Sequence, residues 1–314
     1  MEKLIVVAGP TASGKSACSV ELALLLNTEI VSADSMQIYK GLDIGTAKIT
    51  EKEKKGVIHH MIDITPYSKS YSVNEYSQNA QVCIDNIIKK GKIPILSGGT
   101  GLYINSVIQN FNLSDVKTDE NLRKELTQLY EKKGGEYMLN ILREFDEETA
   151  NTLHPNNHRR IIRAIEVYKT SGMTMSEQRE ITKNTPKKYD VCFFVLNTDR
   201  EILYERINKR VDKMIQIGLE AEVDRILADN VSDKSSTAFQ AIGYKELISY
   251  KKGEMTFEEA VDKIKLESRR YAKRQLTWFR KNENTIWIDT ADFGDNPEKI
   301  AEFMRNEVDK KWQI

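Results

Sequence analysis

The chain has few cysteines and no long apolar run, whereas many cysteines or a long apolar run are typical of secreted, zinc-binding and membrane proteins. Only three cysteines occur in 314 residues, Cys18, Cys83 and Cys192, and they lie far apart without a CxxC pair. This spacing argues against a disulfide framework and a zinc finger. The N-terminal segment LIVVAG is too short for a signal peptide, and no apolar run approaches the roughly 20 residues that cross a bilayer. We therefore expect a cytoplasmic globular protein.

An excess of charge of one sign is also missing. The 47 basic residues balance 47 acidic ones, whereas nucleic-acid-binding domains typically carry a basic patch. The charges are nevertheless segregated, because residues 263–281 hold eight basic side chains and one acidic one, and acidic residues predominate after Asn282. The overall balance therefore leaves room for one basic face that contacts RNA, although such a face can also be merely solvated.

Short apolar segments alternate with helical ones in much of the chain. Such alternation predicts a parallel sheet flanked by helices, which is an α/β fold. Asp199 is well placed to begin one of the later helices as its N-cap. The predicted strands are 4–8, 29–33, 92–97 and 190–197, and the predicted helices are 15–26, 73–90, 199–217 and 256–280.

The pattern changes to helical periodicity without a strand over residues 114–186. Asp119 is placed as the N-cap of one helix, and Gly172 follows the end of another. We expect an all-helical insertion domain at 114–186 and a core domain formed by 1–113 and 187–314.

A glycine-rich motif follows the first predicted strand. Gly9, Gly14, Lys15 and Ser16 satisfy the pattern G-x-x-x-x-G-K-[ST] between a strand and a helix. Backbone N–H groups of such a loop bind a phosphate or diphosphate at the positive end of the helix, and Lys15 adds a charge. The Ser16 hydroxyl is a candidate ligand for Mg²⁺. The motif leaves open whether a phosphoryl group is transferred, hydrolysed or released, and a plain glycine-rich turn is the structural alternative.

Other candidates follow the predicted strands, at the sheet edge where open α/β sheets bind ligands. Asp34 could accept a proton there, or it could cap the next turn. Gln37 has an amide suited to the N6 and N7 edge of adenine. Thr100 lies in the segment SGGTGLY, which is either a ligand-binding loop or a tight turn into a helix. Arg206 and Arg210 lie one turn apart and suit diphosphate oxygens, unless both are solvated.

The predicted helix 256–280 carries both apolar and basic positions. Ile264, Tyr271 and Trp278 repeat every seven residues, as a core-facing stripe does, while Arg270 and Arg274 share another face. This arrangement is compatible with contacts to an RNA backbone.

Taken in order, the motifs resemble the tRNA dimethylallyltransferase (isopentenyltransferase) family of bacterial type, over nearly the whole chain. The stretches that carry the resemblance include GPTASGKS, DSMQIYKGLDIGTAK, HHMIDI, SGGTGLY, RRIIRAIEVY, AIGYKE and RRYAKRQLTWFR. The resemblance implies a P-loop NTPase-like fold and transfer of a dimethylallyl group from dimethylallyl diphosphate to N6 of adenine at tRNA position 37. It also implies Mg²⁺ as cofactor, tRNA as partner and a monomeric enzyme.

The resemblance also assigns roles to individual residues. Asp34, Thr100 and Arg210 are implied to be catalytic. The diphosphate site comprises Gly9, Pro10, Thr11, Ala12, Ser13, Gly14, Lys15 and Ser16. The tRNA contacts comprise Asp34, Ser35, Met36, Gln37, Thr100, Arg123, Arg159, Arg160, Ile161, Ile162, Arg163, Ala241, Ile242, Gly243, Tyr244 and Lys245.

Two rival functions share the phosphate loop. A small-molecule kinase would use Asp34 to orient a substrate hydroxyl, and either Asp34 or Asp199 could serve its metal ion. An RNA-binding NTPase would use the insertion purely as a binding module. The kinase predicts ATP consumption, the NTPase predicts RNA-stimulated phosphate release, and prenyl transfer predicts diphosphate release without nucleotide turnover.

Overall fold

The computed structural model describes residues 1–109, 119–229, 237–282 and 284–313, and the chain forms two compact units. Unit 1 comprises Met1–Ile108 and Lys188–Ile314, and unit 2 comprises Gln109–Lys187. The domain boundary predicted at residues 113 and 114 lies outside the described residues. Within the described ranges, no helix is both long and apolar enough to cross a membrane.

Unit 1 is built around a six-stranded sheet of order β4-β2-β6-β1-β7-β8, in which all paired strands run parallel. A second, two-stranded parallel sheet pairs β3 with β5. The α/β class predicted from the sequence is confirmed. The strands are β1 (Glu2–Ala8), β2 (Ile30–Ser32), β3 (Tyr39–Lys40), β4 (His59–His60), β5 (Thr65–Pro66), β6 (Ile95–Gly98), β7 (Tyr189–Asn197) and β8 (Thr285–Asp289).

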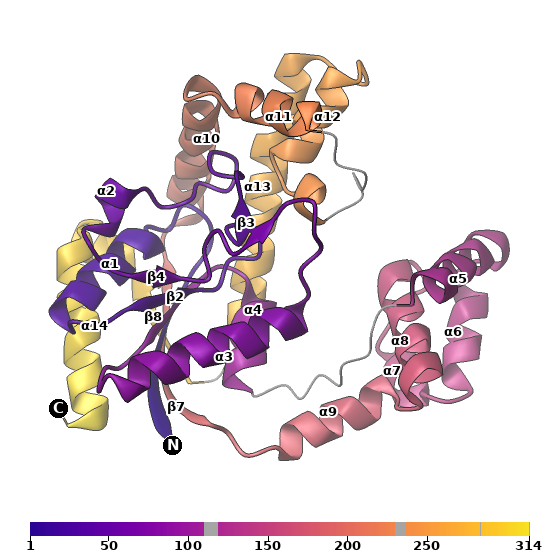
Figure 1. The fold of residues 1–314 in the computed structure, drawn as a ribbon, viewed down its shortest axis with the longest axis horizontal. Helices are drawn as coiled ribbons and strands as arrows, with labels where there is room; N and C mark the ends of the chain where they lie inside the picture. Colours follow the sequence, from indigo (N-terminus) through magenta and orange to yellow (C-terminus); the bar gives the residue numbers. More distant parts are fainter. Residues whose placement is uncertain (110–118, 230–236, 283, 314) are drawn as a thin grey trace. The chain divides into compact units, whose positions relative to one another are not determined.

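Helices cover both faces of the six-stranded sheet (Figure 1). Because successive side chains of a strand point to opposite faces, β1 contributes to two cores. Leu4, Val6 and Ala8 join the core packed with α3 and α4, whereas Ile5 and Val7 join the core packed with α1 and α14. The four helices are α1 (Lys15–Leu25), α3 (Val73–Lys89), α4 (Gly101–Ile108) and α14 (Pro297–Trp312).

A third core joins four more helices of unit 1 to residues 36–47. Asp199 begins α10 by accepting hydrogen bonds from Glu201 N and Ile202 N, and Thr256 begins α13 through a reciprocal capping box with Glu259. The predicted starts of both helices are confirmed. The helices are α10 (Arg200–Gln216), α11 (Leu219–Ala228), α12 (Tyr244–Lys251) and α13 (Phe257–Phe279), accompanied in unit 1 by α2 (Glu51–Lys54) and the 3-10 helices Thr237–Gln240 and Thr290–Phe293.

The strand register brings three loops of unit 1 together. Ala8 of β1 lies opposite Gly98 of β6, and Ser32 of β2 lies opposite Ser97 of β6. Since these strands are parallel, their carboxyl ends share one edge of the sheet. The loops that follow, beginning at Gly9, Ala33 and Gly99, are therefore neighbours.

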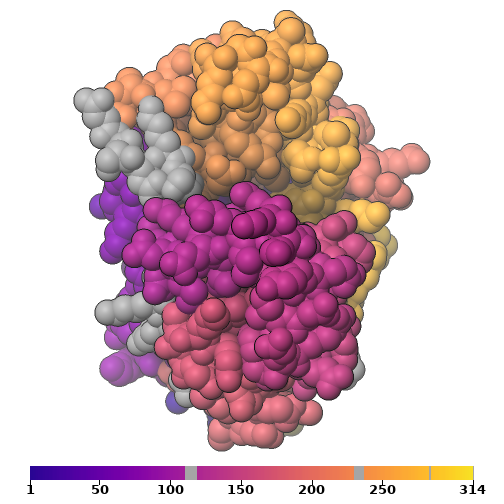
Figure 2. Space-filling view, turned by 90° about the vertical axis from the view of Figure 1, so that its right-hand side faces the viewer, coloured from indigo at the N-terminus to yellow at the C-terminus, as the bar shows by residue number. Residues whose placement is uncertain are grey.

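In its described residues, unit 2 consists of helices. They pack around a core that includes Leu126, Met138, Leu142 and Ile165. Figure 2 shows the outer surface of these helices, in magenta and pink. Asp119 caps the first of them, as predicted, by accepting hydrogen bonds from two backbone N–H groups. The helices are α5 (Glu120–Lys133), α6 (Gly135–Arg143), α7 (Glu147–Asn151), α8 (His158–Ser171) and α9 (Met175–Asn184).

Candidate active site

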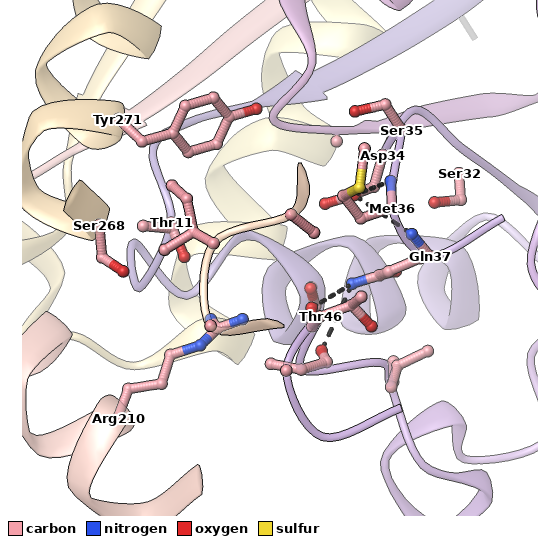
Figure 3. A pocket seen from close by; sticks show the side chains of 18 of the residues that line it. Thr11, Ser32, Asp34, Ser35, Met36, Gln37, Thr46, Arg210, Ser268 and Tyr271 are labelled. Carbon is pink, nitrogen blue, oxygen red and sulfur yellow. Dashed lines mark hydrogen bonds between the residues drawn. The ribbon is translucent and has the colours of Figure 1, made fainter. Parts of the chain in front are cut away.

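A cavity of about 350 Å³ opens in unit 1 at the carboxyl edge of the sheet (Figure 3). Its walls come from the phosphate loop, the turn after β2, helices α10 and α13, and the segment 240–245. Polar groups of the loops therefore share one cavity with apolar side chains such as Ile207, Val211 and Ile264. Such a site suits a ligand with a charged end and a small apolar end.

The phosphate loop lies between β1 and the first turn of α1, as the motif predicts. Gly14 has a φ of 81°, a left-handed conformation that glycine adopts without steric cost and that begins α1. Of the eight predicted loop residues, Thr11, Lys15 and Ser16 line the cavity. The others, Gly9, Pro10, Ala12, Ser13 and Gly14, complete the loop, and the buried Ser13 hydroxyl has no hydrogen-bond partner.

Four cationic side chains line the cavity: Lys15 from the phosphate loop, Arg210 from α10, Lys245 from α12 and Arg274 from α13. Lys15 and Arg210 are the two whose pKa is lowered. Burial, together with the nearby Arg210 and against the opposing effect of Asp34, lowers the pKa of Lys15 to about 8. Burial likewise lowers the pKa of Arg210, again opposed by Asp34. Neither Lys15 nor Arg210 forms an ion pair with any residue in the described part of the chain. Desolvated cations that form no direct ion pair favour an anionic ligand, even with the Asp34 carboxylate nearby.

The two arginines predicted to act as a pair have different surroundings. Arg206 lies one turn before Arg210 but forms an ion pair with Asp295 at 2.5 Å. Arg210 points into the cavity (Figure 3). Solvation, the alternative considered for both, therefore does not describe Arg210.

Asp34 caps the turn, which is one of the two roles that the sequence left as alternatives, and it keeps one oxygen for the other role. Its Oδ1 caps the turn by accepting hydrogen bonds from Met36 N (2.9 Å) and Gln37 N (3.3 Å) (Figure 3). Its Oδ2 accepts no hydrogen bond from the described residues, and Asp34 lines the cavity. One oxygen is thus fixed by the backbone, and the other is available to a ligand.

Thr100 lies behind the Asp34 turn, and its side chain holds that turn in place. Its Oγ1 accepts a hydrogen bond from Ser35 N (3.1 Å) and donates one to Ser35 Oγ (3.3 Å). The Tyr271 hydroxyl lies on the same side, toward the Asp34–Ser35 turn, and burial raises the pKa of Tyr271 to about 12 (Figure 3). The geometry therefore gives Thr100 a positioning role for Asp34.

Gln37 does not present its amide as predicted for an adenine edge. Its Nε2 donates hydrogen bonds to Thr46 O and Ala47 O, both at 3.3 Å (Figure 3). Because the amide nitrogen is already used, the predicted two-bond pairing with adenine is not formed in this arrangement. Ser35 and Met36, the neighbouring candidates, both line the cavity.

The candidate segment 241–245 divides between the cavity and the core. Ala241, Ile242, Gly243 and Lys245 line the cavity. Tyr244 is instead buried, with its hydroxyl donating to Glu222 at 2.6 Å. The Tyr244 side chain is therefore turned into the core, and the tRNA contact predicted at this position stays a prediction.

The remaining tRNA candidates lie in unit 2. Arg159 and Arg160 are exposed at the start of α8. Arg123 and Arg163 donate to the fully buried Glu166 at 2.8 and 2.9 Å, which leaves both guanidiniums partly exposed. Helical periodicity turns the side chains of Ile161 and Ile162 into the core, where they are 0% and 5% exposed, so the tRNA contacts predicted at these two positions stay predictions.

Sequence reasoning missed three residues of α13 that line the cavity, Ser268, Tyr271 and Gln275. Their spacing of three and four residues is a signal for a shared helix face. Tyr271 was assigned to a core-facing stripe with Ile264 and Trp278, but its hydroxyl points toward the Asp34–Ser35 turn (Figure 3). Ile264 and Trp278 do pack against cores.

The lowered pKa of Lys15 predicts a pH dependence of anion binding. A protonated Lys15 attracts an anion and a neutral one does not, so affinity for methyl diphosphate should fall as pH rises through about 8. The phosphate groups themselves are ionised throughout this range. Calorimetric titrations on both sides of that pH, repeated with Lys15→Arg, test the prediction. An affinity of the unmutated protein that does not change across this range would contradict it.

Comparisons with known proteins agree with this geometry. Residues 37–282 match the family model described as IPP transferase. The chain is 48% identical over 305 residues to the tRNA dimethylallyltransferase of Acetivibrio thermocellus, which covers 97% of each chain. It is 46% identical over 313 residues to that of Halalkalibacterium halodurans, which covers 99% of each.

Solved structures are similar as well. One is a tRNA isopentenylpyrophosphate transferase from Bacillus halodurans, with 43% identity, a TM-score of 0.73 and coverage of 100% of this chain and 99% of that one. Another is a eukaryotic dimethylallyltransferase described as acting on tRNA, with 28% identity, a TM-score of 0.77 and coverage of 94% of this chain and 75% of that one. The chain therefore belongs to the IPP transferase family.

Proposed function

We propose that this protein transfers a dimethylallyl group from dimethylallyl diphosphate to N6 of the adenine at position 37 of tRNA, with release of diphosphate. The observation that carries the proposal is that Lys15, Arg210 and the free oxygen of Asp34 share one cavity. Lys15 and Arg210, which form no ion pair in the described residues, suit a departing diphosphate, and a carboxylate suits an amine that loses a proton. The named activities of the relatives are in accord with this chemistry.

The reaction follows from the positions of these groups. The N6 nitrogen attacks the allylic carbon, a carbon–nitrogen bond forms, and the carbon–oxygen bond to diphosphate breaks with its electron pair. Lys15, the loop N–H groups and Arg210 stabilise the charge that develops on the leaving group. Oδ2 of Asp34 accepts the N6 proton while the Met36 and Gln37 N–H groups hold Oδ1. A stacked adenine cannot reach this cavity, so we infer that the base is flipped out of the anticodon loop.

A divalent cation, inferred to be Mg²⁺, fits the phosphate loop. No cluster of three or more His, Cys, Asp or Glu side chains that could hold a metal ion is found among the described residues. Mg²⁺ commonly binds through one or two protein groups together with substrate phosphates and water. The exposed Ser16 hydroxyl at the cavity is the candidate protein ligand. When bound there, the ion would neutralise charge on the diphosphate.

The kinase alternative is less well supported by the geometry. One of its candidate metal ligands, Asp199, spends its carboxylate on the N-cap of α10, with Glu201 N at 2.7 Å, and it does not line the cavity. Asp34 is then the remaining carboxylate candidate near the phosphate loop. Prenyl transfer needs one carboxylate, to accept the proton of the attacking amine, and Asp34 can supply it.

A release assay tests the proposed reaction. With tRNA, dimethylallyl diphosphate and Mg²⁺, the protein should release diphosphate in proportion to the tRNA supplied. ATP in place of dimethylallyl diphosphate should stay intact, with or without tRNA. Phosphate released from ATP on addition of RNA would support the NTPase instead, and ATP-dependent phosphorylation of a small molecule would support the kinase.

Exposed arginines of unit 2 are proposed to bind the tRNA backbone. Arg159→Ala should weaken tRNA binding several-fold and lower the slope of log affinity against log salt by about 1, as expected for one lost phosphate contact. The transfer rate at saturating tRNA should be unchanged. Lys169→Ala, near the other end of α8, is the matched control. A lower rate at saturating tRNA with unchanged affinity would contradict this role for Arg159.

A further inference from the structure

Gln275 of α13 connects two loops that are far apart in the sequence. Its Oε1 accepts a hydrogen bond from Thr11 N of the phosphate loop at 3.0 Å. Its Nε2 donates to Gly99 O of the β6–α4 loop at 2.8 Å. The side chain is 5% exposed and borders the cavity. Both ends of one amide are thus used by backbone groups of the site.

The connection continues to the proposed proton acceptor. Gly99 precedes Thr100, and Thr100 Oγ1 accepts from Ser35 N at 3.1 Å, next to Asp34. A hydrogen-bonded path therefore runs from Thr11 through Gln275 and the 99–100 segment to the turn that carries Asp34.

The packing around Gln275 leaves little freedom for its amide. A Cβ added at Gly99 would lie 2.2 Å from Gln275 Nε2. Moving the amide away would leave Thr11 N–H and the Gly99 carbonyl without their partner in a largely buried place, which carries a free-energy penalty. The absence of a side chain at Gly99 and the amide of Gln275 thus fit one another.

We propose that Gln275 is a positioning residue that holds the phosphate loop and the Gly99–Thr100 segment in one frame. This frame fixes the leaving diphosphate relative to Asp34. The inference rests on the proposed prenyl transfer, because the distance between the diphosphate site and Asp34 affects the rate only if the diphosphate leaves as Asp34 accepts the proton. Gln275 itself exchanges no proton with the substrate.

Gln275→Met tests this role, because methionine keeps the volume and removes both hydrogen bonds. We expect kcat for prenyl transfer to fall by roughly 10²-fold, the loss expected for a misplacement of about 1 Å. KM for tRNA should change little. Gln81→Met on α3, away from the cavity, is the matched control and should retain the unmutated kcat. An unchanged kcat in Gln275→Met, or a loss confined to the KM for tRNA, would overturn the proposal.

A double-mutant cycle of Gly99→Ala and Gln275→Ala tests the same role by comparing losses between variants, so that a folding defect in Gln275→Met does not decide the outcome. Gly99→Ala should lower kcat and methyl diphosphate affinity, because its Cβ displaces the Gln275 amide. In the Gln275→Ala background the obstruction is gone, so Gly99→Ala should add little further loss. Equal losses from Gly99→Ala in both backgrounds would overturn the proposal.

The two hypotheses can fail separately. Methyl diphosphate binding by calorimetry reports the Gln275–Gly99 coupling without any prenyl transfer. If the unmutated protein fails to prenylate tRNA but the binding cycle is non-additive, the proposed function is wrong and Gln275 still organises the phosphate loop. If prenylation occurs and the cycle is additive, the Gln275 proposal is wrong.

Discussion

Asp34→Asn is expected to lower the rate of prenyl transfer by about 10²- to 10⁴-fold, the range for loss of a general base. Asparagine keeps an Oδ1 that can accept from Met36 N and Gln37 N, so the turn should retain its shape. Its Nδ2 cannot accept the N6 proton, however. Single-turnover rates with saturating tRNA, together with the tRNA dissociation constant, separate chemistry from binding.

The control for Asp34 is Asp43→Asn. Asp43 lies on the surface and shares Lys48 with Asp63, so loss of its charge should leave the rate unchanged. If Asp34→Asn weakened tRNA affinity and left the single-turnover rate intact, Asp34 would be a contact residue and not the proton acceptor.

Arg210→Met should lower kcat by about 10²- to 10³-fold, as removal of one group that stabilises transition-state charge does. The matched control is Arg206→Met, one turn earlier on α10, where the guanidinium pairs with Asp295. That variant should keep the unmutated rate. Equal rate losses in both variants would indicate a general effect on α10 and contradict a role for Arg210 at the diphosphate.

Arg210→Met carries a second expected result that can be read without turnover. Arg210 contributes to the lowered pKa of Lys15, so its removal should let that pKa rise. The loss of methyl diphosphate affinity should therefore begin at higher pH than in the unmutated protein. If methyl diphosphate affinity of the variant fell at the same pH as that of the unmutated protein, Lys15 and Arg210 would not interact.

Local sequence signals sufficed for the framework of unit 1 and for the first helix of unit 2. Alternation of apolar strands with helices predicted the parallel sheet, and the side chains of Asp119 and Asp199 predicted helix starts within one residue. Periodicity and helix caps depend only on residues close together in the sequence, so they can be recognised without the structure. The short strands β3, β4 and β5 have two residues each, too few to produce a periodic pattern.

The site required information that local patterns do not contain. Arg206 and Arg210 look alike in sequence, and Asp295, 89 residues beyond Arg206, separates their surroundings. Gln275 reaches Thr11 across 264 residues, which no spacing rule indicates. In contrast, the burial of Ile161 and Ile162 could have been predicted, because two apolar residues between arginines on a helix mark its inner face.

The most direct test of the central claim locates the transferred group. After incubation with dimethylallyl diphosphate and a tRNA that has adenine at position 37, nuclease fragments are weighed by mass spectrometry. The fragment containing position 37 should gain one dimethylallyl group in place of one hydrogen, and a tRNA with guanine there should gain none. An unmodified adenine 37 in a tRNA known to be a competent substrate would contradict the claim.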